Sequence, residues 1–208
     1  MLIFHENYYS AAELLKKSAA QIVFFKNKRQ AITDRINRGM KFQHKVAEEK
    51  GCTAEEFRTC IEYKDIIIFA CHDLITEDGF VEVKNIDEGT EVAQWFLESS
   101  LLQCAFYKSL LLHSNGFVTT PKFRIKEGYN KESKRVDINK PYILHIGNDE
   151  YKVSLKNKKA SEKILEYFYE KAKSTGNYDD ARLYDSTHKF KHFEHLKKYF
   201  TYEKINCR

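Results

Sequence analysis

The chain has 208 residues, 42% of them hydrophobic, and this is long enough to bury a core without disulfides or other staples. Its 35 basic and 30 acidic side chains leave a net charge of +5. This balance permits a nucleic-acid partner but does not indicate one by itself. We expect a single α/β domain that spans residues 1–208.

The cysteines and the apolar runs exclude several classes of protein. No two cysteines form a Cys-x-x-Cys pair, so neither a zinc ribbon nor a disulfide framework is predicted. No apolar run approaches the length of a membrane span, and the N-terminus lacks a signal-type segment. We expect a soluble, unexported protein with reduced thiols, in the cytoplasm or, for a viral or phage protein, inside the host cell, without a membrane partner. The five cysteines are Cys52, Cys60, Cys71, Cys104 and Cys207.

Two helices are predicted before the first strand. Helical spacing of apolar residues predicts one over residues 10–26, with Ser10 as its cap, and a second over residues 32–49 that continues through Gly39. The second helix is dense in cations, which could meet phosphates or could form an ordinary solvated face. These cations are Arg29, Arg35, Arg38, Lys41 and Lys45.

A β-hairpin follows and carries most of the candidate chemistry. Strands are predicted over residues 58–62, 65–75 and 80–86, with a four-residue turn between the last two. Because strand side chains alternate, Glu82 and Lys84 share one face, and Asp73 reaches that face if the hairpin register is regular.

Two carboxylates and the backbone carbonyl of Val83 offer the oxygen ligands that a hard divalent cation prefers. Lys84 could then hold or activate an attacking water and neutralise charge that develops on a phosphoryl group. Taken alone, the Glu-Val-Lys triplet is equally explained by an ion pair on a solvated strand. The other motifs of the chain distinguish a metal site from such an ion pair.

The next helix is predicted over residues 90–113 and ends at Asn115-Gly116. Gln103 and Tyr107 stand one turn apart on it, as candidates for gripping a phosphate or bracing Lys84. A half-buried tyrosine whose hydroxyl reaches water is the alternative interpretation of this pair.

The second half of the chain predicts more strands and helices. Strands are expected over residues 117–125, 141–146 and 151–155, with a charged loop at 126–140, and helices over 161–174 and 178–202. The last segment interleaves basic and aromatic residues, a pattern that can grip single-stranded nucleic acid. An amphipathic helix that packs its Phe face inward is the favoured interpretation.

The order of the motifs is more specific than any one of them. Gly39-x4-His44, Asp73, Glu82-Val83-Lys84 and Gln103-x3-Tyr107 follow one another along the chain. This order resembles the PD-(D/E)XK nuclease superfamily, in particular its RecB-type branch with a Gln-x-x-x-Tyr motif. The resemblance implies a restriction-endonuclease-like core, with the motifs at about residues 36–113, a mixed central sheet flanked by helices, and helical N- and C-terminal segments.

The same resemblance implies a set of site residues. Asp73, Glu82 and His44, with the backbone carbonyl of Val83, would bind Mg²⁺ or Mn²⁺. Lys84 would be the catalytic lysine, and Gln103 and Tyr107 would position it or the DNA backbone. The expected nucleic-acid-binding residues are Arg35, Arg38, Lys41 and Tyr107.

The implied activity is hydrolysis of DNA phosphodiester bonds to leave a 5′-phosphate, most simply by an exonuclease or end-processing enzyme on single strands or DNA ends. A restriction-type endonuclease, a viral RNA endonuclease and a non-catalytic DNA-binding or assembly module remain as alternatives. A homo-oligomer or a partner protein in DNA processing is compatible with each of them.

Two features of the sequence depart from the family pattern. His72 stands where the family usually has proline before the first aspartate. The iron-sulfur cysteines of many relatives are missing, because no cysteine precedes Cys52 and only Cys207 lies near the C-terminus. We therefore expect no iron-sulfur cluster.

Overall fold

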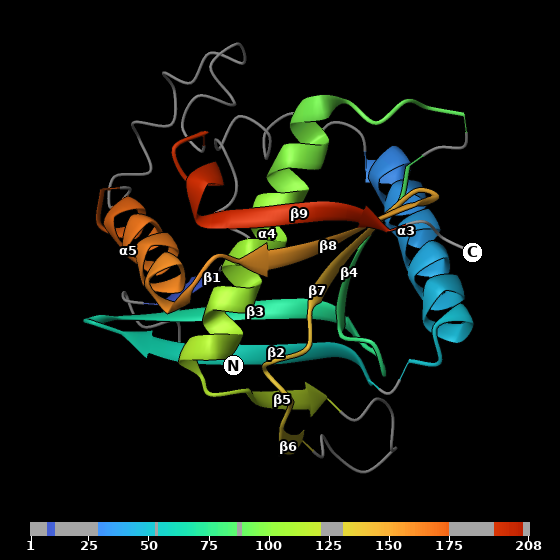
Figure 1. Cartoon of the computed structure of the whole chain (residues 1–208). Coiled ribbons are helices and arrows are strands. Elements are labelled where there is room, and N and C mark those ends of the chain that lie inside the picture. Colours follow the sequence, from blue (N-terminus) through green and yellow to red (C-terminus); the bar gives the residue numbers. More distant parts are fainter. Residues whose placement is uncertain are drawn as a thin grey trace.

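The computed structural model describes residues 8–10, 29–52, 54–86, 89–121, 131–174 and 194–205. These residues form an α/β fold around a mixed nine-stranded sheet with the order β6-β5-β2-β3-β4-β7-β8-β9, and β1 beside β3 (Figure 1). The strands are β1 (Tyr8–Ser10), β2 (Ala54–Tyr63), β3 (Ile66–Ile75), β4 (Phe80–Lys84), β5 (Phe117–Pro121), β6 (Lys131–Arg135), β7 (Tyr142–Ile146), β8 (Asp149–Leu155) and β9 (Phe200–Ile205). The helices are α3 (Arg29–Glu49), α4 (Gln94–His113), α5 (Lys158–Ser174) and the 3₁₀ turn η3 (Lys197–Tyr199).

The sheet is covered on both faces. Helices α4 and α5 share one core with the sheet, in which Phe106 of α4 stacks on Phe168 of α5 with 3.8 Å between ring centroids. Helix α3 packs on the opposite face, where Val46 and Ala47 meet Val81 of β4 (Figure 1). Helix α4 is buried along most of its length, as expected for a helix that is apolar on nearly all sides.

The β3–β4 hairpin opens soon after its turn. The residues between the strands, 76–79, form the predicted turn, and Gly79 is needed there because its φ is +156° and a Cβ would meet the carbonyl of Pro141. Only Leu74–Val81 and Ile75–Phe80 pair across the hairpin. Strand β4 then continues in parallel register with β7 over its whole length. A gap therefore opens between β3 and β4 at the level of Asp73 and Glu82.

A second irregularity lies at the same level. His72 and Ile75 both belong to the α4 side of the sheet, whereas Leu74 belongs to the α3 side. Strict alternation would place His72 and Leu74 on one face. The side chains of β3 change face at Asp73, which stands opposite Glu56 of β2. The φ of Glu56 is 51°, and this residue interrupts the β2–β3 ladder between regular pairs.

Most predicted elements are confirmed, with ends shifted by a few residues. The helix that runs through Gly39, the three-strand meander, the helix ending before Asn115-Gly116 and the helix ending at Ser174 are all present. The first predicted helix, over residues 10–26, lies outside the described residues beyond Ser10, which ends β1.

Two predicted elements of the second half are wrong. Residues 131–135, predicted as loop, form strand β6, an edge strand whose Lys134 and Arg135 are exposed and therefore carry no hydrophobic alternation. The predicted C-terminal helix is wrong over its described part, because Phe200–Ile205 form β9, which pairs with the edge of β8. Backbone hydrogen bonds to an open edge outweigh the helical spacing of Leu196 and Phe200, which both enter the core.

In the described part of the chain, no helix is both long enough and apolar enough to cross a membrane. Among the described cysteines, Cys60, Cys71 and Cys104 are free thiols.

A half-buried ion cluster joins Lys50, the residue after α3, to strands β7 and β8. The Glu150 carboxylate accepts from Lys50 at 2.5 Å and contacts the His145 imidazole at 2.8 Å. The hydrogen bond from His145 and the charge of Lys50 outweigh burial and lower the pKa of Glu150 to about 2. A lowered carboxyl pKa stabilises the fold above the unfolded value of 4.5, and this contribution is lost as the pH falls toward 2.

We expect Glu150→Gln to lower the free energy of unfolding by about 2 to 3 kcal/mol at pH 7 and by clearly less at pH 3. Urea unfolding at the two pH values measures the difference. Glu203→Gln is the matched control, because Glu203 is an exposed partner of Lys152. A loss that is equal at both pH values would contradict the assignment of the low pKa to Glu150.

Candidate active site

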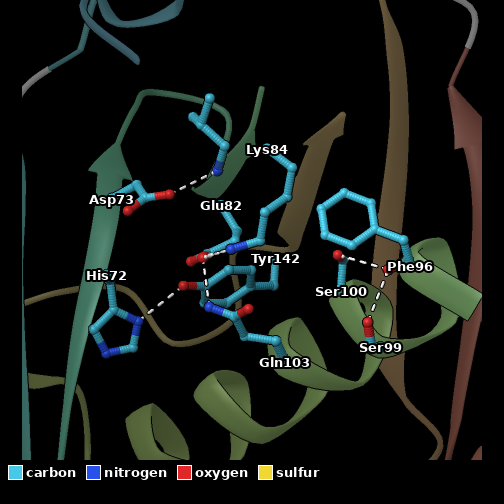
Figure 2. Close-up of polar contacts among 10 residues, drawn as sticks. His72, Asp73, Glu82, Lys84, Phe96, Ser99, Ser100, Gln103 and Tyr142 are labelled. Carbon is cyan, nitrogen blue, oxygen red and sulfur yellow. Dashed lines mark hydrogen bonds and ion pairs between the residues drawn. The ribbon is translucent and has the colours of Figure 1, made fainter. Parts of the chain in front are cut away.

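Glu82 is the centre of a polar cluster within the sheet. It lies on β4 and is 3% exposed, with its side chain directed toward α4. Its Oε1 accepts a hydrogen bond from Lys84 Nζ at 2.6 Å and one from Gln103 Nε2 at 2.5 Å (Figure 2). Both donors therefore converge on one oxygen of the carboxylate.

The other oxygen of the same carboxylate has no partner. Glu82 Oε2 is buried and makes no hydrogen bond to any described residue. Among the described residues it is the one buried side-chain polar atom in this state. Because a buried acceptor without a donor costs about 1 to 3 kcal/mol, such an atom calls for a specific explanation.

Asp73 reaches across the gap between the strands. Its Oδ2 accepts the backbone N–H of Val83 at 2.7 Å, in place of the ladder bond that β3 no longer provides (Figure 2). The N–H and C=O of one strand residue point to the same edge of the strand. The carbonyl of Val83 therefore also faces the gap, on the side of Asp73.

The charges of the cluster do not balance. Burial and the Asp73 charge raise the pKa of Glu82 to about 7, against the effects of Lys84 and Gln103. Burial also raises the pKa of Asp73, although the Lys84 ammonium and the Val83 N–H oppose it. Burial would lower the pKa of Lys84, but the two carboxylates outweigh it and the pKa is raised. One ammonium thus serves two buried carboxylates, and the site favours a further positive charge.

Helix α4 supplies the amide that faces Glu82. The hydroxyl of Tyr107 lies one turn further along the helix, close enough to Gln103 for the amide to oppose the rise of its pKa. Tyr107 is 2% exposed, and burial, together with the charge of Glu82, raises its pKa. Tyr107 therefore lies beside Gln103 within the core, and its burial argues against the direct contact with nucleic acid that the sequence suggested.

His72 occupies the position where the resemblance expects proline, and it is part of the core. Its ring nitrogens contact the Tyr142 hydroxyl and the Thr59 hydroxyl, both at 2.9 Å. The ring also stacks on Phe57, with 4.5 Å between centroids. Burial lowers the pKa of His72 to about 3, so the imidazole is neutral. Tyr142 in turn lies close enough to Glu82 for the carboxylate charge to raise its pKa.

The structure places His44 apart from this cluster. The His44 imidazole is 59% exposed on α3 and contacts the Glu55 carboxylate at 2.9 Å. Glu55 lies on the α3 side of the sheet, opposite Leu74. A ligand role for His44 would need this contact to break and the side chain to reach across the strand.

The predicted nucleic-acid-binding cations lie on the same helix. Arg38 and Lys41 are exposed on α3, the layer opposite α4. The side chain of Arg35 lies outside the described residues, although its backbone belongs to α3. Arg38 and Lys41 are thus available at the surface, on the other side of the sheet from Gln103.

Glu56 is an acidic neighbour that the sequence patterns do not indicate. It stands opposite Asp73 between two regular β2–β3 pairs, and its charge contributes to the raised pKa of Asp73. Side-chain alternation alone does not reveal Glu56, because its left-handed backbone interrupts the regular β2–β3 ladder. An acid at the position opposite Asp73 in the strand register was the signal that could have revealed it.

No family model matches the chain. Neither the curated proteins nor the solved structures contain a significant match. The function therefore has to be argued from the geometry of the site.

The donor types present are those that a divalent cation takes in proteins. Asp73 and the unpartnered Oε2 of Glu82 supply two carboxylates, and the Val83 carbonyl supplies a third oxygen. No group of three or more His, Cys, Asp or Glu side chains in the described ranges is arranged for a metal. Two carboxylates are nevertheless the usual protein share for Mg²⁺, which takes its other ligands from water and substrate phosphates.

Proposed function

We propose that the chain is a metal-dependent nuclease that hydrolyses phosphodiester bonds of DNA, as an exonuclease or end-processing enzyme with a restriction-endonuclease-like core. One observation carries the proposal. Lys84 and Gln103 both bind Oε1 of Glu82, while Oε2 stays buried and unpartnered. An ion pair that served stability alone would have little reason to leave that oxygen bare.

The residues of the cluster have separable roles in this proposal. Asp73, Glu82 and the Val83 carbonyl would hold Mg²⁺ or Mn²⁺. When bound, the cation would supply Lewis acidity for phosphodiester hydrolysis. The side chain of Lys84 is 23% exposed and held by Glu82, so its remaining N–H groups can donate to a phosphate oxygen or to the attacking water. Gln103 keeps Glu82 in place, and Tyr107 lies beside Gln103 one turn away on α4.

The fold supports the proposal through the split between β3 and β4. A sheet that pairs throughout would bury the Asp73 and Glu82 edges behind main-chain hydrogen bonds. Here the gap leaves both carboxylates and the Val83 carbonyl on one side of an opened hairpin, next to the N-terminal half of α4 (Figure 2). We propose DNA rather than RNA as the substrate only because the motifs resemble those of the RecB-type branch.

Digestion of end-labelled single- and double-stranded DNA and RNA, with Mg²⁺, Mn²⁺ or a chelator, tests the proposed function. We expect cleavage of DNA with either metal and none with the chelator. Release of labelled mononucleotides indicates an exonuclease, and internal fragments indicate an endonuclease. Cleavage of RNA alone would favour the RNA endonuclease. Binding without cleavage in every metal would leave a non-catalytic module and contradict the proposal.

Metal binding is expected to stabilise the protein without any substrate. At a Mn²⁺ concentration 100-fold above the dissociation constant, the free energy of unfolding should rise by about 2 to 3 kcal/mol. Glu82→Gln and Asp73→Asn should each abolish most of this gain, because each removes a carboxylate ligand. His44→Ala should retain it, because His44 pairs with Glu55 instead.

Thermal unfolding in Mn²⁺ and in chelator, with direct calorimetric titration of the metal, measures these effects. A metal-induced gain that survives in both carboxylate variants would refute the metal site. Loss of the gain in His44→Ala would instead restore His44 as a ligand.

A further inference from the structure

The tryptophan of this chain stands in line with the proposed site. Trp95, the only tryptophan in the sequence, lies in the first turn of α4 and is 50% exposed. Trp95, Ser99, Gln103 and Tyr107 follow one another at intervals of four residues on the helix. Positions four apart are neighbours on a helix surface, so these four residues form one row.

The row leads from the core to the surface. Tyr107 is 2% exposed, Gln103 and Ser99 are half-buried, and Trp95 is half exposed. Figure 2 shows Ser99 and Phe96 on the turns of α4 that follow Gln103 toward the start of the helix. This row is thus a path along α4 from Gln103, the hydrogen-bond partner of Glu82, to the indole of Trp95.

Trp95 lies eight residues before Gln103, which corresponds to about 12 Å along the helix axis. A polynucleotide strand covers that distance with roughly two to four nucleotides. Lys197 adds a cation next to the same path, because its ammonium pairs at 2.8 Å with Glu98 of α4 and remains 44% exposed. An aromatic face and a nearby cation are the two elements that bind single strands without sequence preference.

We propose that a single-stranded nucleic acid lies along this row, with one of its bases stacked on the Trp95 indole. A phosphate of the same strand, about two to four nucleotides from that base, then reaches the Glu82 site. The inference rests on the proposed nuclease function and adds the surface that receives a single strand, with Trp95 as its stacking residue. A duplex cannot use the row in the same way, because its base faces are already stacked on one another.

Because Trp95 is the only tryptophan, its fluorescence reports on the row directly. Labelled oligonucleotides of increasing length are titrated into the protein in chelator, where cleavage is not expected, and both fluorescence anisotropy and tryptophan emission are recorded. Single strands longer than the row should quench the emission in proportion to binding. A blunt duplex of equal length should quench it clearly less.

Variants separate stacking from general binding. Trp95→Ala should weaken single-strand binding about tenfold, whereas Trp95→Phe should stay within a few-fold of the wild type. Phe117→Ala is the matched control, because Phe117 is an equally exposed aromatic residue (48%) just beyond the opposite end of α4. It should leave the affinity unchanged.

The outcomes also distinguish the inference from the proposed function. If the strand binds with unchanged tryptophan emission, or if Trp95→Ala binds as well as the wild type, the inference is overturned while metal-dependent cleavage can stand. If no nucleic acid is bound or cleaved in any metal, the proposed function fails and the inference fails with it. Equal quenching by the duplex would overturn the single-strand assignment.

Discussion

Replacing Lys84 with methionine is expected to lower the rate of metal-dependent cleavage by about 100- to 1000-fold, the usual cost of removing one preorganised donor from a phosphoryl or oxyanion site. Methionine keeps most of the aliphatic stem of Lys84 and removes the ammonium. The half-buried cation that Glu82 holds at 2.6 Å is then absent. The protein should stay folded, since a raised Glu82 pKa of about 7 allows this carboxylate to take up a proton instead.

Single-turnover cleavage at saturating Mn²⁺ measures the Lys84→Met effect, and circular dichroism confirms the fold. Lys152→Met is the matched control. Lys152 also lies on a strand of the sheet, but its ammonium pairs with the exposed Glu203 at 3.4 Å and has no contact with the site. Its rate should equal that of the wild type. A Lys84→Met protein that cleaves at the wild-type rate would remove Lys84 from the mechanism.

His72→Leu is expected to have the largest effect on stability, a loss of about 2 to 4 kcal/mol. His72, Thr59 and Tyr142 are all fully buried, and the imidazole is the hydrogen-bond partner of both hydroxyls. Leucine fills much of the volume but leaves two buried hydroxyls unsatisfied. Each such group costs about 1 to 3 kcal/mol.

Removing the hydroxyls of Tyr142 and Thr59 in the His72→Leu variant tests this explanation, because it should restore the lost stability. The triple variant His72→Leu, Tyr142→Phe, Thr59→Val has no orphaned hydroxyl and should recover most of the stability, because removing all partners of a buried hydrogen bond is close to neutral. Urea unfolding of the wild type, the single variant and the triple variant measures the recovery. If the triple variant were less stable than His72→Leu, packing rather than hydrogen bonding would explain the effect.

Turn residues and the spacing of apolar side chains along the chain were enough to predict much of the fold. The Asp78-Gly79 turn and the alternation of Phe80-Val-Glu-Val-Lys specify the hairpin, since turn conformation and side-chain direction depend on neighbouring residues only. The hairpin register then places Asp73 beside Glu82, and the four-residue interval of α4 places Gln103 one turn from Tyr107. These proximities are present in the structure, whereas the chemistry assigned to them stays a prediction.

Contacts between distant segments were not encoded in such patterns. Strands β6 and β9 were missed because edge strands are held by main-chain hydrogen bonds, which any exposed sequence can make. His44 was assigned by order along the chain, yet it sits on the α3 side of the sheet with Glu55. The kink at Glu56 and Asp73 depends on the conformation of two strands at once and leaves no trace in either strand alone.

By itself, the amino-acid sequence determined the succession of helices and strands, the hairpin and the residue types that lie near its turn, because each depends on interactions over a few positions. Only the tertiary structure decided which oxygen of Glu82 is bound and which is bare, that His72 is a neutral core residue, and that Trp95 is half exposed. The physical reason is that burial, hydrogen-bond saturation and charge balance are set by groups that meet through folding, and their separation along the chain does not record them.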